Sequence, residues 1–90
     1  VDGAHDIAGL LAQAEHELKT ARYYFVRNAY VAAIERAQRV VREFQNTPMR
    51  DDALELIAQS YEALKLTELA ADTRRIIELN KNGTIAQPSR

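Results

Sequence analysis

Apolar residues recur at intervals of three and four positions along most of the chain, and they divide it into four amphipathic segments. The segments cover residues 6–27, 30–44, 48–65 and 67–81. Such spacing places the apolar side chains on one face of a helix, whereas a half-buried strand would show strict alternation. The pattern therefore predicts an all-α protein with four main helices. The side chains expected to face inward are Ile7, Leu10, Leu11, Ala14, Leu18, Ala21, Phe25, Tyr30, Ala33, Ile34, Ala37, Val40, Val41, Phe44, Leu54, Ile57, Ala58, Tyr61, Leu64, Leu69, Ala70, Thr73, Ile76 and Ile77.

Turn-forming residues separate the four segments. Asn28 tolerates the left-handed backbone conformation that ends many helices, so the first break is expected at Asn28–Ala29. Thr47 is placed to cap the third helix, because the proline at position 48 suits a first helical turn. A short turn near Leu66–Thr67 precedes the fourth helix, and residues 85–90 are expected to form a frayed tail.

The four segments pair into two similar units. A shift of 37 residues places Ala21 on Ala58, Tyr24 on Tyr61, Ala33 on Ala70 and Val40 on Ile77. A tetratricopeptide (TPR) repeat is a helix–turn–helix unit of about 34 residues, and a longer loop between repeats costs little. A chance match between unrelated amphipathic helices is the alternative. We expect one domain, residues 1–90, that forms an α-solenoid fragment of two TPR-like repeats, at about residues 14–47 and 51–84.

The charge balance changes along the chain, although the total is near zero. The formal net charge is −1, so no overall field attracts nucleic acid or a membrane surface. Residues 22–50, however, carry six Arg against two Glu. Arg binds carboxylates through two parallel hydrogen bonds and is enriched at protein interfaces. The middle of the chain is therefore the candidate partner-binding region.

Five arginines of this region are the candidate partner-binding residues: Arg22, Arg27, Arg36, Arg39 and Arg42. The alternative is a solvated helix face on which Glu35 and Glu43 balance the arginines through ion pairs worth about 0.3–0.5 kcal/mol each. Nucleic acid is not expected as a partner, because it needs a more basic domain with aromatic side chains among the bases. The tyrosines of this chain fall instead at positions expected to pack between helices.

The sequence does not predict catalysis, a metal site or a cofactor. His16-Glu17 begins like the helix of a zinc protease, but Thr20 stands where that motif requires its second His. Asp51 and Asp52 are expected at the start of a helix, where the helix dipole favours negative charge. The chain has no cysteine, and it has no apolar run long enough to span a membrane. We expect a binding protein rather than an enzyme.

Three blocks of the chain resemble one known family. Residues 21–25, Ala-Arg-Tyr-Tyr-Phe, are similar to its Ala-x-Tyr-Tyr helix, and residues 27–33, Arg-Asn-Ala-Tyr-Val-Ala-Ala, to its Arg-Gly-Ala-aromatic-Val-Ala turn. Thr47 and the helix that follows it, as far as Tyr61, resemble the start of its last repeat. The family is that of BamD, the TPR lipoproteins of the bacterial outer-membrane β-barrel assembly machine.

The resemblance covers about residues 14–80 and departs from the family at two positions. Asn28 stands in place of a Gly, and both residues accept a left-handed turn. Gln45 stands where a Pro is common, so the end of the second helix is less sharply marked. Because the family has further N-terminal repeats and a lipidated cysteine as its membrane anchor, the resemblance implies a C-terminal fragment.

The resemblance also implies a function that residue spacing alone does not predict. Members of the family act as non-catalytic scaffolds on the periplasmic face of the outer membrane. Their C-terminal repeats dock on the periplasmic POTRA domain of BamA, and accessory lipoproteins such as BamC and BamE also contact them. The alternative expectation is an unrelated TPR adaptor that binds other proteins. A TPR groove that clamps a peptide carboxylate would need three repeats, and this chain holds two.

Overall fold

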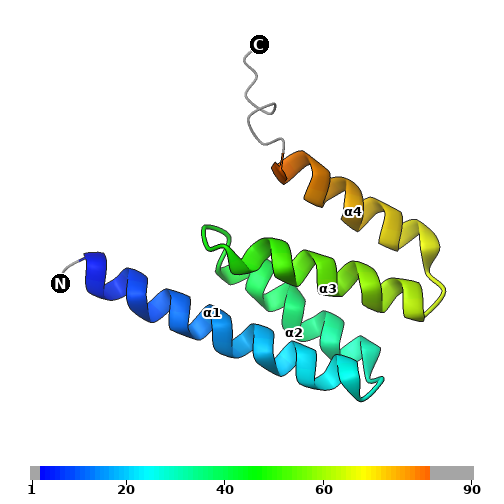
Figure 1. Ribbon diagram of the computed structural model, residues 1–90, viewed down its shortest axis with the longest axis horizontal. Helices are drawn as coiled ribbons and strands as arrows, with labels where there is room; N and C mark the ends of the chain where they lie inside the picture. Colours follow the sequence, from blue (N-terminus) through cyan, green and yellow to red (C-terminus); the bar gives the residue numbers. More distant parts are fainter. Residues whose placement is uncertain (1–2, 82–90) are drawn as a thin grey trace, which may run out of the picture.

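Four helices build the protein. A computed structural model describes residues 3–81, with side chains from residue 8 onward. The helices are α1 (Gly3–Val26), α2 (Tyr30–Glu43), α3 (Met49–Ala63) and α4 (Thr67–Lys81), and the described residues include no strand (Figure 1). The predicted all-α fold of two helix–turn–helix units is confirmed. The expected frayed tail and the predicted end of the second repeat lie outside the described residues.

The turn between α1 and α2 closes with a Schellman motif. The backbone N–H of Ala29 donates to the carbonyl of Tyr24, and that of Asn28 donates to Phe25, both at 2.9 Å. Asn28 has a φ of 66°, the left-handed conformation that this motif requires of the residue after the helix. The break predicted at Asn28–Ala29 is confirmed.

The turn between α3 and α4 repeats that motif at a residue poorly suited to it. The N–H of Leu66 donates to the carbonyl of Tyr61 at 2.8 Å, and the N–H of Lys65 donates to Glu62 at 3.0 Å. Lys65 has a φ of 68°, a conformation that is uncommon for a residue other than Gly or Asn. Since Lys65 follows Asn28 by the 37-residue shift seen in the sequence, both hairpins reverse the chain at equivalent positions.

The linker between α2 and α3 differs from its prediction. Thr47 does not cap α3, since the helix begins at Met49 and Pro48 holds the capping position without a side-chain hydrogen bond. Instead, the Thr47 hydroxyl donates to the carbonyl of Phe44 at 2.7 Å. The backbone N–H of Thr47 donates to the same carbonyl at 3.1 Å, so Thr47 closes the end of α2 rather than the start of α3.

Small residues allow the helices to pack closely. Ala21, Ala33 and Ala58 are fully buried, and Ala70 is 3% exposed. The core residues are Ala14, Leu18, Ala21, Ile34, Ala37, Val40, Phe44, Ala53, Leu54, Leu56, Ile57 and Ile77. Leu56 and Ser60 of α3 are also buried although the apolar pattern did not include them, because α3 contacts all three other helices.

Three side chains predicted to face inward are largely exposed: Leu10 by 46%, Leu69 by 45% and Ile76 by 47%. Leu10 belongs to the N-terminal part of α1, which reaches beyond the ends of α2 and α3 (Figure 1). Leu69 and Ile76 belong to α4, which contacts α3 alone among the described helices. A helix covered on one side can bury only one part of its apolar face.

The first and second helices of the two hairpins differ in their contacts. α1 contacts both α2 and α3, whereas the described residues of α2 and α4 do not touch each other. The first helices of the two hairpins therefore contact one another, whereas the second helices, α2 and α4, lie on either side of α3 (Figure 1). No described helix is long and apolar enough to cross a membrane.

Candidate partner-binding surfaces

Glu17 of α1 holds two of the candidate arginines of α2. Arg39 Nη1 donates a long hydrogen bond to Glu17 Oε2 at 3.5 Å, and Arg36 Nη1 lies 3.8 Å from Oε1. Glu17 Oε1 is buried and accepts no hydrogen bond in the described structure, so the nearby charge of Arg36 compensates for its burial. The expected partners Glu35 and Glu43 form no ion pair within the described residues.

Two tyrosines lie among these arginines. The guanidinium carbon of Arg27 is 4.4 Å from the ring centroid of Tyr23, and that of Arg36 is 5.9 Å from the ring of Tyr24. The two rings meet edge to face, with centroids 5.5 Å apart. Because Tyr23 is 52% exposed, the prediction that it packs between helices is wrong. We call Tyr23, Tyr24, Arg27, Arg36 and Arg39 the arginine–tyrosine surface.

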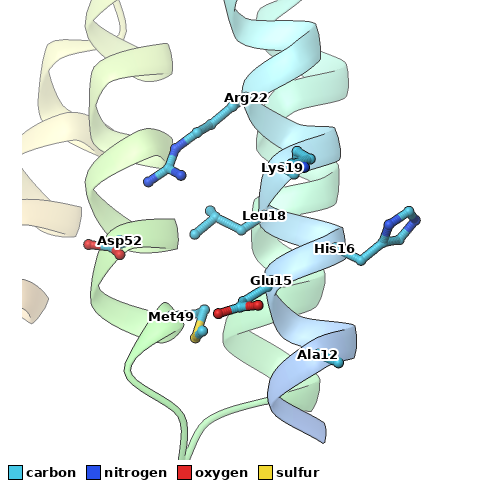
Figure 2. A pocket seen from close by; sticks show the side chains of 8 residues that line it. All are labelled: Ala12, Glu15, His16, Leu18, Lys19, Arg22, Met49 and Asp52. Atoms are coloured by element: carbon cyan, nitrogen blue, oxygen red, sulfur yellow. The ribbon is translucent and has the colours of Figure 1, made fainter. Parts of the chain in front are cut away.

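Arg22 lies apart from that surface. It extends from α1 toward α3 into a groove of about 520 Å³, above Asp52, and Glu15 and Met49 lie further along the same groove (Figure 2). His16 also borders this groove, but Figure 2 shows its ring pointing outward. Arg22 therefore faces the other repeat rather than the surface formed with α2.

Arg42 lies in a third place. It borders a second groove, of about 320 Å³, which Tyr61 of α3 and Ile76 of α4 also line. Arg42 forms no ion pair within the described residues. The five arginines that the sequence grouped together are thus distributed over three surfaces, and only Arg27, Arg36 and Arg39 lie together.

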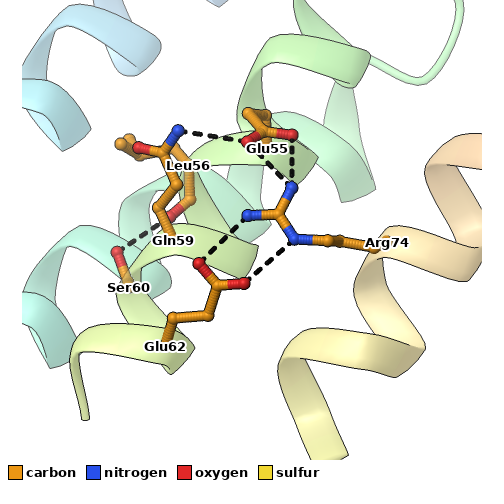
Figure 3. A network of polar contacts seen from close by, with 6 residues as sticks. All are labelled: Glu55, Leu56, Gln59, Ser60, Glu62 and Arg74. Atoms are coloured by element: carbon orange, nitrogen blue, oxygen red, sulfur yellow. Dashed lines mark hydrogen bonds and ion pairs between the residues drawn. The ribbon is translucent and has the colours of Figure 1, made fainter. Parts of the chain in front are cut away.

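The densest polar contact of the described residues was missed by sequence reasoning. Arg74 of α4 donates from Nη1 to both oxygens of Glu55, at 3.0 and 2.9 Å, and from Nε and Nη2 to the two oxygens of Glu62, each at 3.1 Å (Figure 3). The hydrogen bond from Arg74 lowers the pKa of Glu55. Glu55 and Glu62 are two turns apart on α3, the only signal that the sequence offers. The contact joins α3 to α4.

The described residues provide little for chemistry. Asp51 and Asp52 lie in the first turn of α3, as predicted, and Asp51 accepts a long hydrogen bond from Asn80 at 3.5 Å. Thr20, the residue in place of a second metal-binding His, donates to the carbonyl of His16 at 3.0 Å. Among the described side chains, no three His, Asp or Glu residues are grouped to hold a metal ion.

Paired helices with exposed charged and aromatic side chains define a helical-repeat protein of the TPR-like class. Residues 5–76 match the YfiO family, whose description is outer membrane lipoprotein. The chain belongs to this family.

Relatives with known names agree with this assignment. The outer membrane protein assembly factor BamD of Neisseria meningitidis serogroup B is 42% identical over 77 residues, which are 83% of this chain and 29% of that protein. BamD of Pasteurella multocida is 39% identical over 74 residues, 82% of this chain and 28% of the relative. The chain thus spans less than a third of these relatives. The resemblance to the BamD family is confirmed, and it disfavours an unrelated TPR adaptor.

Proposed function

We propose that this chain is a non-catalytic docking scaffold in outer-membrane protein assembly, on the periplasmic face of the outer membrane. Its relatives are named as assembly factors of outer membrane proteins, and its family is described as an outer membrane lipoprotein. The proposed partner of the arginine–tyrosine surface is the POTRA domain of BamA. Accessory lipoproteins such as BamC and BamE are proposed to contact other faces of the chain.

The observation that carries the proposal is the way Glu17 orders Arg36 and Arg39. Their side chains are 41% and 46% exposed, while Glu17 is 19% exposed. A carboxylate anchored in the neighbouring helix restricts both arginines before any partner arrives, which reduces the entropy lost on binding. Arg and Tyr are also the side chains most enriched among residues that dominate binding energy. An acidic patch on the partner is the expected counterpart.

A titration with the isolated POTRA domain of BamA tests this proposal. The double variant Arg36→Glu, Arg39→Glu should weaken binding by about tenfold or more, because each change sets like charges against the acidic patch. Arg75→Glu is the matched control, since Arg75 is an equally charged residue of α4, 68% exposed and away from the surface. If the double variant and the control bind with equal affinity and both keep their helicity, the arginine–tyrosine surface does not bind the POTRA domain.

A further inference from the structure

The groove between α2 and α4 is apolar and open. Its floor is formed by Leu54, Ile57 and Tyr61 of α3, with Val41 of α2 on one wall and Ile76 of α4 on the other. The hydroxyl of Thr73, which also lines it, donates to the carbonyl of Leu69 at 2.8 Å. Because the Thr73 hydroxyl keeps its hydrogen bond within α4, an apolar occupant would not bury an unpaired polar group.

A further stacked repeat would not fill this groove. The contact of α2 with α3 shows how one hairpin packs on the next, and Val41 lies on that side, against the core. The equivalent of Val41 in α4, 37 residues later, is Glu78, which is exposed. The stacking side of α4 is therefore polar at this position, whereas Ile76 lines the groove between α2 and α4.

We propose that this groove receives an amphipathic helix of a partner protein that carries an acidic residue beside its apolar stripe. Helices bind between two parallel-running helices by inserting side chains spaced at i, i+4 and i+7. The volume of about 320 Å³ lies at the lower end of the range of binding cavities, about 300–1,000 Å³, so it accommodates a few anchor side chains and not a whole helix.

The positive charge of Arg42 at the rim of the groove would bind the acidic residue of the partner helix. Arg42 is the charged side chain among the residues that line the groove, and it forms no ion pair in the described part of the chain. A carboxylate one turn from the apolar anchors would meet it and would be excluded from water by the same contact. This surface is separate from the arginine–tyrosine surface, so either proposal can fail without the other.

Fluorescence anisotropy with two labelled peptides tests the inference. The acidic peptide is a capped Ala/Gln helix with Leu at i, i+4 and i+7 and one Glu flanking the stripe, and the basic peptide has Lys in place of that Glu. The acidic peptide should bind the 90-residue chain saturably and at least tenfold more tightly than the basic one. Arg42→Glu should reverse this preference, which a purely apolar attraction would not do.

A matched pair of variants on α4 locates the binding site. Ile76→Glu should weaken binding of the acidic peptide at least tenfold, whereas Leu79→Glu should not, because Leu79 is 56% exposed but does not line the groove. Both residues are largely exposed, so circular dichroism should show unchanged helicity. Equal effects of the two variants, or a peptide preference that Arg42→Glu leaves in place, would overturn the inference.

Two further results would assign the groove to another occupant and would equally overturn it. The first is peptide binding that occurs only after residues 82–90 are removed, which would mean that the chain covers its own groove. The second is self-association of the wild-type chain in sedimentation that Ile76→Glu abolishes and Leu79→Glu retains, which would make the occupant a second copy.

Discussion

The guanidinium of Arg74 on α4 holds the carboxylate of Glu62 on α3 through two parallel hydrogen bonds, both 3.1 Å long. The remaining nitrogen of the same group binds Glu55, which lies two turns before Glu62 on the same face of α3. Because α4 contacts only α3 among the described helices, this three-residue contact is well placed to fix the angle between them. Arg is suited to it, since its planar group can satisfy two carboxylates at once.

Arg74→Ala should lower the free energy of unfolding by about 1 kcal/mol, the upper part of the range for exposed ion pairs. Exposure of all three side chains, between 39% and 50%, keeps the effect that small. For a domain of this size the melting temperature should fall by about 4–8 °C, measured by thermal circular dichroism. Arg75→Ala, which removes a pair within one helix at 68% and 62% exposure, should shift the melt far less.

Low pH should remove the stabilisation of the folded protein by ionised Glu55. The hydrogen bond from Arg74 holds the pKa of Glu55 below its ordinary value of 4.5. A lowered folded-state pKa stabilises the protein above the unfolded-state value, and that stabilisation is lost as the pH falls through the folded-state value. The difference in urea midpoint between the wild type and Glu55→Gln should therefore be larger at pH 6 than at pH 3. When both proteins also carry Arg74→Met, the difference in urea midpoint should no longer depend on pH.

Lys65→Gly should stabilise the turn between α3 and α4. Lys65 has a φ of 68°, and a left-handed backbone costs a side-chain-bearing residue roughly 1 kcal/mol, a penalty that Gly avoids. Asn28→Gly is the matched comparison at the equivalent turn, where the gain should be smaller because Asn tolerates the conformation. That change also removes the hydrogen bond from the Tyr30 hydroxyl to Asn28, 2.8 Å long. A higher melting temperature for Asn28→Gly than for Lys65→Gly would contradict this account.

The two tyrosines related by the repeat should differ in their effect on stability. Tyr61 packs against the buried core, so Tyr61→Ala should cost about 3 kcal/mol, near the low end for aromatic deletions because the side chain is only half buried. Tyr24 instead lies between Tyr23 and Arg36 on the arginine–tyrosine surface, and Tyr24→Ala should cost clearly less. Chemical denaturation of the two variants measures the difference, and equal losses would show that Tyr24 is a core residue too.

Much of the fold follows from local patterns in the sequence. The apolar spacing predicted four helices, and their observed bounds differ from the predicted ones by at most a few residues. The break at Asn28 was predictable because one residue and its neighbours decide a left-handed turn. The second turn was predicted near Leu66–Thr67 and lies there, but the left-handed conformation of Lys65 was not predictable, since nothing in a lysine favours it.

The candidate site could be predicted only in part. Sequence grouped five arginines by their proximity along the chain, but a helix turns each successive residue by about 100°, so neighbours in sequence face different helices. The structure keeps Arg36 and Arg39 together because Glu17 of α1 reaches both. Arg22 instead lines a groove with residues of α3, and Arg42 lines a groove that α4 borders.

The sequence by itself determined that this chain forms paired helices, where the first hairpin turns, and which small residues let the helices meet. Those features depend on residues within one or two helical turns of each other. Only the tertiary structure decided which face of α4 stays open, which carboxylates bind Arg74, and which arginines share a surface. Each of these depends on residues far apart in the sequence, such as Arg39 and Glu17, which are 22 positions apart. The geometry that joins such residues exists only once the helices have packed.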